Sequence, residues 1–84
     1  MKSESVLPPP SRAEGHYSNF FKVGFNAFEF VLDFGQAYHE TEGEAIYTRI
    51  ITTPPYARAL AELLLRTLDQ YEADYGDIWR EPAA

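Results

Sequence analysis

Cysteine is absent from this 84-residue sequence, and long apolar runs are absent with it. Without thiols the chain can form neither disulfides nor thiolate metal sites, which fits a reducing compartment. No segment approaches the roughly 20 apolar residues of a membrane-spanning helix, and the N-terminus lacks the apolar stretch of a signal peptide. The sequence therefore predicts a soluble, cytoplasmic protein.

Basic residues are also scarce, with 7 Lys and Arg against 13 Asp and Glu and a formal net charge of −6. Nucleic-acid binders gather Lys and Arg on one surface to neutralise phosphates. Here these residues are scattered, so the charge distribution argues against nucleic acid as a partner. The sequence also has no glycine-rich phosphate loop and no serine-centred elbow, and we predict no enzyme activity, no catalytic residue, no cofactor and no metal.

The chain has room for one small domain. A domain of this size buries only roughly 60% of the surface that its unfolded chain exposes, so disulfides, a metal or a partner chain usually add stability. Residues 1–15, MKSESVLPPPSRAEG, are predicted to be a disordered arm because they offer little to a core. Its prolines could dock a partner or act as a stiff spacer. Residues 16–79 form the predicted domain, and residues 80–84 a short tail.

Alternating side chains predict three strands, at residues 17–26, 28–37 and 45–53. Phe28, Phe30, Leu32 and Phe34 would share one face of the second strand. Asn26 and Ala27 lie where a two-residue hairpin turn would be, although Ala27 is a poor turn residue and a longer loop stays open.

A helix is predicted over residues 54–75. Thr53 is a suitable N-cap, the two prolines after it suit a first helical turn, and Gly76 suits the C-terminal end. One apolar stripe runs along the helix, made of Ala57, Leu60, Ala61, Leu64, Leu68, Tyr71 and Tyr75. We expect this stripe to cover one face of the sheet, with Phe30 and Leu64 in the core.

Some apolar residues remain outside this arrangement. They are Phe20, Val31, Ile46 and Ile50, expected together on the opposite sheet face, and Leu63 and Leu65, on either side of the helix stripe. Exposed apolar patches commonly mark an interface. We therefore predict that these six residues form the interface of a homodimer or larger closed oligomer.

Few residues have types suited to chemistry. His16 lies beside the predicted arm, where a solvated side chain is expected. The segment YHETEGE places His39, Glu40, Glu42 and Glu44 together, but it lacks a second histidine, and we interpret it as a solvated acidic loop. Phe20, Lys22 and Arg49 could share one sheet face, which keeps single-stranded nucleic-acid binding open as an alternative.

Two blocks of the sequence, YSNFFKVGFNAFEFVLDFGQ and TRIITTPPYARALAELLLRTLDQYEADYGDI, resemble a family of small bacterial proteins, domain of unknown function 3467. The resemblance covers residues 17–78. It implies a short soluble bacterial protein, assigns no activity or cofactor, and transfers no catalytic residue. The position of Phe25 often carries His in that family, so any role of that histidine does not apply to this chain.

The combined prediction is an α+β fold, a three-stranded antiparallel meander with one C-terminal amphipathic helix packed on it, and a dimer. The predicted function is that of a non-enzymatic structural or adaptor module that associates with itself, and an unidentified protein partner stays possible. Two alternatives are the nucleic-acid binder described above and a small regulatory subunit that docks on a larger protein.

Overall fold

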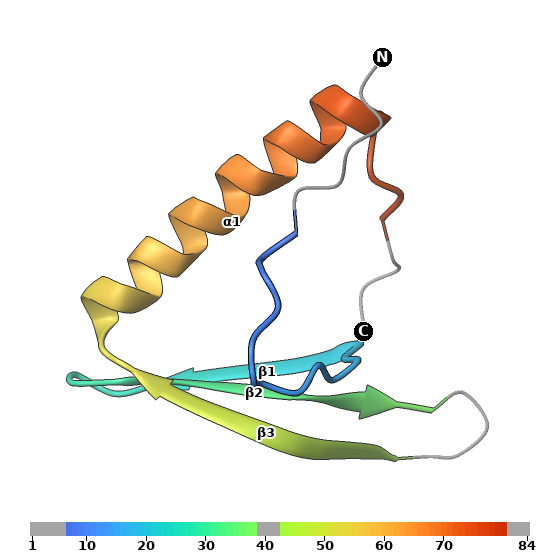
Figure 1. The fold of residues 1–84 in the computed structure, drawn as a ribbon. Coiled ribbons are helices and arrows are strands. Elements are labelled where there is room, and N and C mark those ends of the chain that lie inside the picture. Colours follow the sequence, from blue (N-terminus) through green and yellow to red (C-terminus); the bar gives the residue numbers. More distant parts are fainter. Residues whose placement is uncertain (1–6, 39–42, 81–84) are drawn as a thin grey trace.

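The computed structural model describes residues 7–38 and 43–80. They form three strands and one helix: β1 (Phe20–Phe25), β2 (Phe30–Ala37), β3 (Glu44–Thr52) and α1 (Pro54–Tyr75). The strands make one antiparallel sheet in the order β1-β2-β3, and α1 follows (Figure 1). The predicted α+β fold, a three-stranded antiparallel sheet and then one helix, is confirmed, and the helix has its predicted bounds. The predicted arm lies partly outside the described residues, and its described part, residues 7–15, is exposed and has no regular structure.

Residues 26–29 connect β1 and β2, and the backbone N–H of Asn26 donates to the carbonyl of Glu29 at 3.0 Å across this turn. Asn26 Oδ1 accepts hydrogen bonds from the backbone N–H of Phe28 at 2.8 Å and from the backbone N–H of Glu29 at 3.0 Å. This turn of the chain places Phe25 opposite Phe30, so β2 begins at Phe30. The prediction that Phe28 belongs to the second strand is wrong: Phe28 lies in the loop and is 83% exposed.

The register divides the sheet into two unlike faces, because paired residues share a face and neighbours along a strand alternate. The apolar face carries Phe21, Val23, Phe25, Phe30, Leu32, Phe34 and Ile50, with Thr48 and Thr52. The charged face carries Phe20, Lys22, Val31, Asp33, Arg49, Ile51 and Ile46. A β-bulge separates Thr48 from Ile46, since these residues pair with the adjacent Phe34 and Gly35 and leave Tyr47 as the additional residue of β3.

At the bulge the backbone of β3 comes very close to Gly35. A Cβ on this residue would overlap the carbonyl oxygen of Ala45 and would lie 2.8 Å from the carbonyl carbon of Ala45 and 3.0 Å from Cα of Ile46. A glycine inside a strand commonly marks such a close backbone approach. The bulge therefore requires glycine at this position of β2.

The ends of α1 follow the predicted capping pattern. Thr53 Oγ1 accepts the backbone N–H of Tyr56 at 3.4 Å, and Pro54 and Pro55 occupy the first two helical positions. At the other end Gly76 has φ of 95° and its N–H donates to the carbonyl of Glu72 at 2.9 Å. Glycine reaches positive φ without steric cost, so it ends the helix here.

The helix does not pack on the sheet. Figure 1 shows α1 rising steeply from the end of β3, and no residue of α1 is buried. Leu64, expected in the core, is 55% exposed, while Phe30 is half-buried. The physical reason lies at the junction, where Thr53 alone separates β3 from α1 and the following prolines fix φ near −65°. This short, stiff connection sets the direction in which the helix leaves the sheet.

Candidate interaction surface

Aromatic pairs organise the apolar face of the sheet. Phe21 and Phe34 are opposite each other on β1 and β2, with ring centroids 5.8 Å apart in an edge-to-face arrangement. Phe25 and Phe30, also opposite, are stacked at 5.6 Å. Cross-strand aromatic pairs of this kind stabilise an antiparallel sheet. They also leave a broad apolar surface on the side of the sheet that carries them.

That surface is open in the single chain. Phe21 is 58% exposed, Val23 63% and Ile50 47%. In the part of the chain that the structure describes, no apolar side chain is fully buried. Contiguous exposed apolar patches commonly mark interaction surfaces. The apolar face is therefore the candidate interaction surface of the sheet.

The charged face has an ion pair at its centre. Arg49 donates from Nε to Asp33 Oδ1 at 2.7 Å and from Nη2 to Oδ2 at 2.9 Å. Asp33 is 8% exposed, whereas the side chain of Arg49 is 62% exposed. The hydrogen bonds from Arg49, helped by the charges of Arg49 and Lys22, lower the pKa of Asp33, although partial burial opposes them. The same pairing raises the pKa of Arg49.

This ion pair predicts a pH-dependent stability. Because the pKa of Asp33 is lowered from 3.8 in the folded chain, its stabilisation is present above that value and is lost as the pH falls through the lowered pKa. Asp33→Asn should therefore lower the urea midpoint at pH 7 and make little difference once Asp33 is protonated in both states. Asp69→Asn, which changes an exposed carboxylate of α1, is the control. If Asp33→Asn changed the urea midpoint equally at pH 7 and at a pH below the lowered pKa of Asp33, this account would be contradicted.

The six residues predicted as an interface do not lie on one surface. Phe20, Val31 and Ile46 share the charged face, as expected. Ile50 pairs with Leu32 and lies on the apolar face, so its predicted place beside the other three is wrong. The cause is the bulge, which reverses the alternation between Ile46 and Ile50. Two further members, Leu63 and Leu65, lie on α1 and are 53% and 62% exposed.

Sequence reasoning missed the residues that hold the C-terminal end of β2. Ser18 Oγ donates to the carbonyl of Gly35 at 2.9 Å and accepts its N–H at 3.1 Å. Asn19 Oδ1 accepts the N–H of Ala37 at 2.9 Å, and its Nδ2 donates to the carbonyl of Ala37 at 3.4 Å. These two side chains are named here the Ser-Asn clamp. At Gly35 they act together with the backbone N–H of Asn19, which donates to the same carbonyl at 3.1 Å, and at Ala37 they take the place of a strand partner. The signal in the sequence is two short polar side chains directly before an apolar strand.

The residues considered for chemistry are dispersed. His16 is exposed, with its ring 5.7 Å from the Tyr47 ring and Nε2 3.6 Å from Glu14. Of the acidic segment, residues 39–42 lie outside the described residues, and Glu44 is exposed at the start of β3. Within residues 7–38 and 43–80, no group of three or more His, Cys, Asp or Glu side chains could hold a metal ion.

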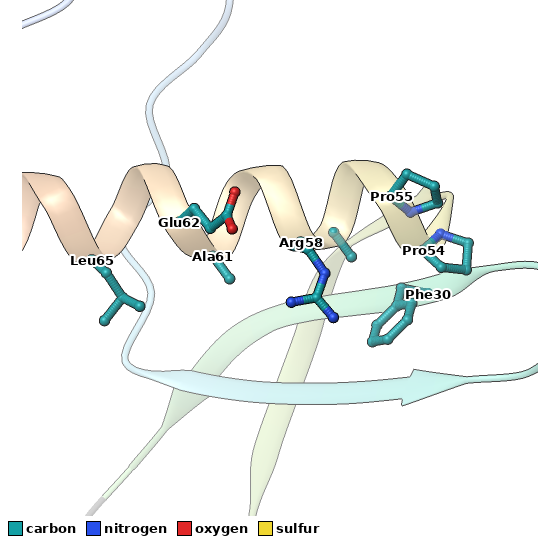
Figure 2. Close-up of a pocket in the computed structure, with 8 residues that line it drawn as sticks. Phe30, Pro54, Pro55, Arg58, Ala61, Glu62 and Leu65 are labelled. Atoms are coloured by element: carbon teal, nitrogen blue, oxygen red, sulfur yellow. The ribbon is translucent and has the colours of Figure 1, made fainter.

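A groove lies between the first turns of α1 and the sheet (Figure 2). Its volume is about 860 Å³, and it is lined by Phe30, Pro54, Pro55, Ala57, Arg58, Ala61, Glu62 and Leu65. Figure 2 shows the Arg58, Ala61 and Leu65 side chains projecting from α1 toward the strands. The groove is open and mostly apolar, and it continues the exposed surface of the sheet at Phe30 toward the helix.

A family model described as "Protein of unknown function (DUF3467)" matches residues 2–80 of the chain. The chain belongs to this family. The DUF3467 match includes both blocks that carry the resemblance and extends through most of the N-terminal arm. No curated protein and no solved structure matches the chain. Within the described residues of this DUF3467 chain, no helix combines the length and apolar character needed to cross a membrane.

Proposed function

We propose that this DUF3467 chain is a non-enzymatic module that works as a homo-oligomer, in a structural or adaptor role. The observation that supports this proposal is the apolar face of the sheet, which the chain's own helix leaves uncovered. We place the protein in the cytoplasm of bacteria, which fits a cysteine-free chain. Its function is then to form this assembly and to hold the components of the assembly together.

Burial argues for association. A folded domain needs a set of apolar side chains removed from water, because this is the main favourable term against the entropy lost on folding. The described residues of one chain do not provide such a core. A second copy would provide it, since an interface of standard size buries about 1,600 Å² in total.

A copy of the same chain is a better partner for the apolar face than a chain of another kind. The face carries no charged residue, so two copies can meet there without opposing like charges, even though each chain has a net charge of −6. The ion pair of Asp33 and Arg49 lies on the opposite face. A two-fold contact uses one patch on both subunits, and an uncharged apolar patch is suited to that use.

The test is the mass in solution. We expect sedimentation equilibrium to give a dimer or larger closed assembly at micromolar concentration. The unfolding midpoint should also rise with protein concentration, because mass action links association to folding. A well-folded monomer with a concentration-independent midpoint would contradict the proposal.

Two matched substitutions identify the face that is used. Val23 and Ile51 are 63% and 61% exposed, and they lie on the apolar and the charged face respectively. Val23→Lys should dissociate the assembly, because the new charge would have to be buried in the interface. Ile51→Lys should leave the mass unchanged. The reverse pattern would move the interface to the charged face, where Phe20, Val31 and Ile46 lie.

One observation favours the nucleic-acid alternative. Phe20, Lys22 and Arg49 do share the charged face, and Lys22 Nζ lies 5.8 Å from the centroid of the Phe20 ring. However, Asp33 holds the Arg49 guanidinium, which weakens its attraction for a phosphate. Anisotropy of labelled single-stranded oligonucleotides at low salt is the test, and salt-sensitive binding that Lys22→Ala removes would favour this alternative. A regulatory role of the arm would require a partner of its exposed prolines, Pro8 to Pro10.

A further inference from the structure

Helix α1 carries the residue spacing of a coiled coil. Within its apolar stripe, side chains recur at alternating intervals of four and three residues; these residues, called here the heptad seam, are Ala57, Ala61, Leu64, Leu68, Tyr71 and Tyr75. A repeat of this kind keeps one narrow seam facing a partner helix. In the single chain Leu64 is 55% exposed, Tyr71 48% and Tyr75 55%. The seam has no partner within the described chain.

The seam residues differ in size between the two ends of α1. The N-terminal end carries the small Ala57 and Ala61, and the C-terminal end carries Tyr71 and Tyr75, whose ring centroids are 5.1 Å apart. Two such seams side by side in parallel would set alanine against alanine and tyrosine against tyrosine. In the antiparallel arrangement each tyrosine meets an alanine, and Leu64 meets Leu68. Large residues opposite small ones allow the close packing that cores require.

The charged residues beside the seam also differ between the two ends of α1. Arg58 and Glu72 lie on the same flank of the seam, one near each end of α1, and neither forms an ion pair within the described chain. In a parallel pair this flank of one helix faces the other flank of its partner, so Arg58 and Glu72 would not meet. An antiparallel pair places Arg58 of each copy near Glu72 of the other and also opposes the two helix dipoles favourably.

The groove beside the seam has room for the tyrosines. Its lining includes Ala57 and Ala61 from the seam, together with Phe30 of the sheet and Arg58. Its volume of about 860 Å³ is open at the side of α1 (Figure 2). In the antiparallel register, the tyrosine end of a second α1 lies against this alanine end, with its Glu72 near the Arg58 that borders the groove.

We propose that α1 pairs antiparallel with α1 of a second copy, so that Tyr71 and Tyr75 of each copy enter the groove of the other. This inference rests on the proposed self-association and deepens it, because it names the elements in contact and their register. Size, charge and available space on one helix all select the antiparallel register. The two-fold axis then crosses the helix pair at the level of Arg66, midway along α1 between Ala57 and Tyr75.

Spin labels on the outer side of α1 test the register without touching the seam. Ala59, Arg66 and Ala73 lie one heptad apart, are exposed, and are absent from the seam. Because the chain has no cysteine, Ala59→Cys, Arg66→Cys and Ala73→Cys each provide one labelled thiol per copy. Distances between the two copies are measured by pulsed dipolar spectroscopy, and the mass of each labelled protein is measured in parallel.

In the antiparallel register the Arg66→Cys labels are the closest pair. The labels at Ala59→Cys and at Ala73→Cys should each be offset along the helix axis by about 21 Å, since a helix rises about 1.5 Å per residue. Equal distances at all three positions would show parallel helices and overturn the inference. A dimeric mass without these distances would overturn it and leave the proposed self-association intact, whereas a folded monomeric mass would overturn both.

A charge reversal gives an independent readout. Arg58→Glu should raise the dimer dissociation constant roughly tenfold, because two pairs that each contribute modestly become repulsive. Adding Glu72→Arg to the same chain should restore the affinity, since the pairs then reform with opposite sense. Arg66→Glu, on the outer side of the helix, is the matched control. Failure of Glu72→Arg to rescue Arg58→Glu would show that these residues do not meet across the interface.

Discussion

Gly35→Ala is expected to unfold the chain at room temperature. The added Cβ would overlap the carbonyl oxygen of Ala45 and approach Cα of Ile46 to 3.0 Å. These are backbone atoms of β3, which cannot move aside as the end of a flexible side chain can. Overpacking costs about 1–3 kcal/mol where side chains can shift, so we expect about 3 kcal/mol or more at this position. That is a large share of the stability of a small domain.

Gly24→Ala is the matched control. Gly24 is the glycine of β1, and a Cβ there would meet nothing within 4 Å. This substitution should leave the urea midpoint unchanged or raise it slightly, because alanine lowers the entropy of the unfolded chain. Circular dichroism during urea unfolding distinguishes the two variants. Equal midpoints for Gly24→Ala and Gly35→Ala would show that β3 relaxes at the bulge.

Leu32→Asp is expected to abolish both the assembly and the fold. Leu32 lies on the central strand, with Val23 opposite it on β1 and Ile50 opposite it on β3. A second copy on the apolar face would seal the new carboxylate away from water without a partner, and an unpaired buried charge costs several kcal/mol. Sedimentation and circular dichroism should show an unfolded or aggregated chain.

Leu32→Met is the control for this position. It keeps the volume and the apolar character, and swaps of this kind usually cost less than about 1.5 kcal/mol. The variant should remain folded and associated. A folded Leu32→Asp chain with the wild-type mass would show that the apolar face stays in water and that the copies meet elsewhere.

Local signals were sufficient to predict the helix. Thr53, the prolines after it and Gly76 act through hydrogen bonds and dihedral angles within a few residues, so the bounds of α1 follow from the sequence. The first residue of β2 did not follow from the sequence in the same way. It depends on Asn26, whose side chain closes the loop by accepting two backbone N–H groups. A turn pattern that reads Asn26 only as tolerant of positive φ misses this role.

Features that depend on two strands at once could not be predicted from one. Ile46 and Ile50 alternate in phase in the sequence, and only the pairing with β2 shows that the bulge places them on opposite faces. The separation of α1 from the sheet was missed for a related reason. An apolar stripe indicates that a helix packs on something, but not whether that surface belongs to the same chain. Leu64 is the clearest case, a stripe residue expected in the core and found more than half exposed.

The Ser-Asn clamp limits where a strand of another chain can add to the sheet. Strand β2 extends further than β1, and its surplus backbone groups would be an open template on which a strand of another chain could add. Asn19 occupies the N–H and the carbonyl of Ala37 with side-chain atoms, which cannot pass the hydrogen-bond ladder on to a further strand. A strand of another chain therefore cannot add to β2 at this end. The edges of the three-stranded sheet are β1 and β3, so addition of a strand from another chain is directed to their outer sides.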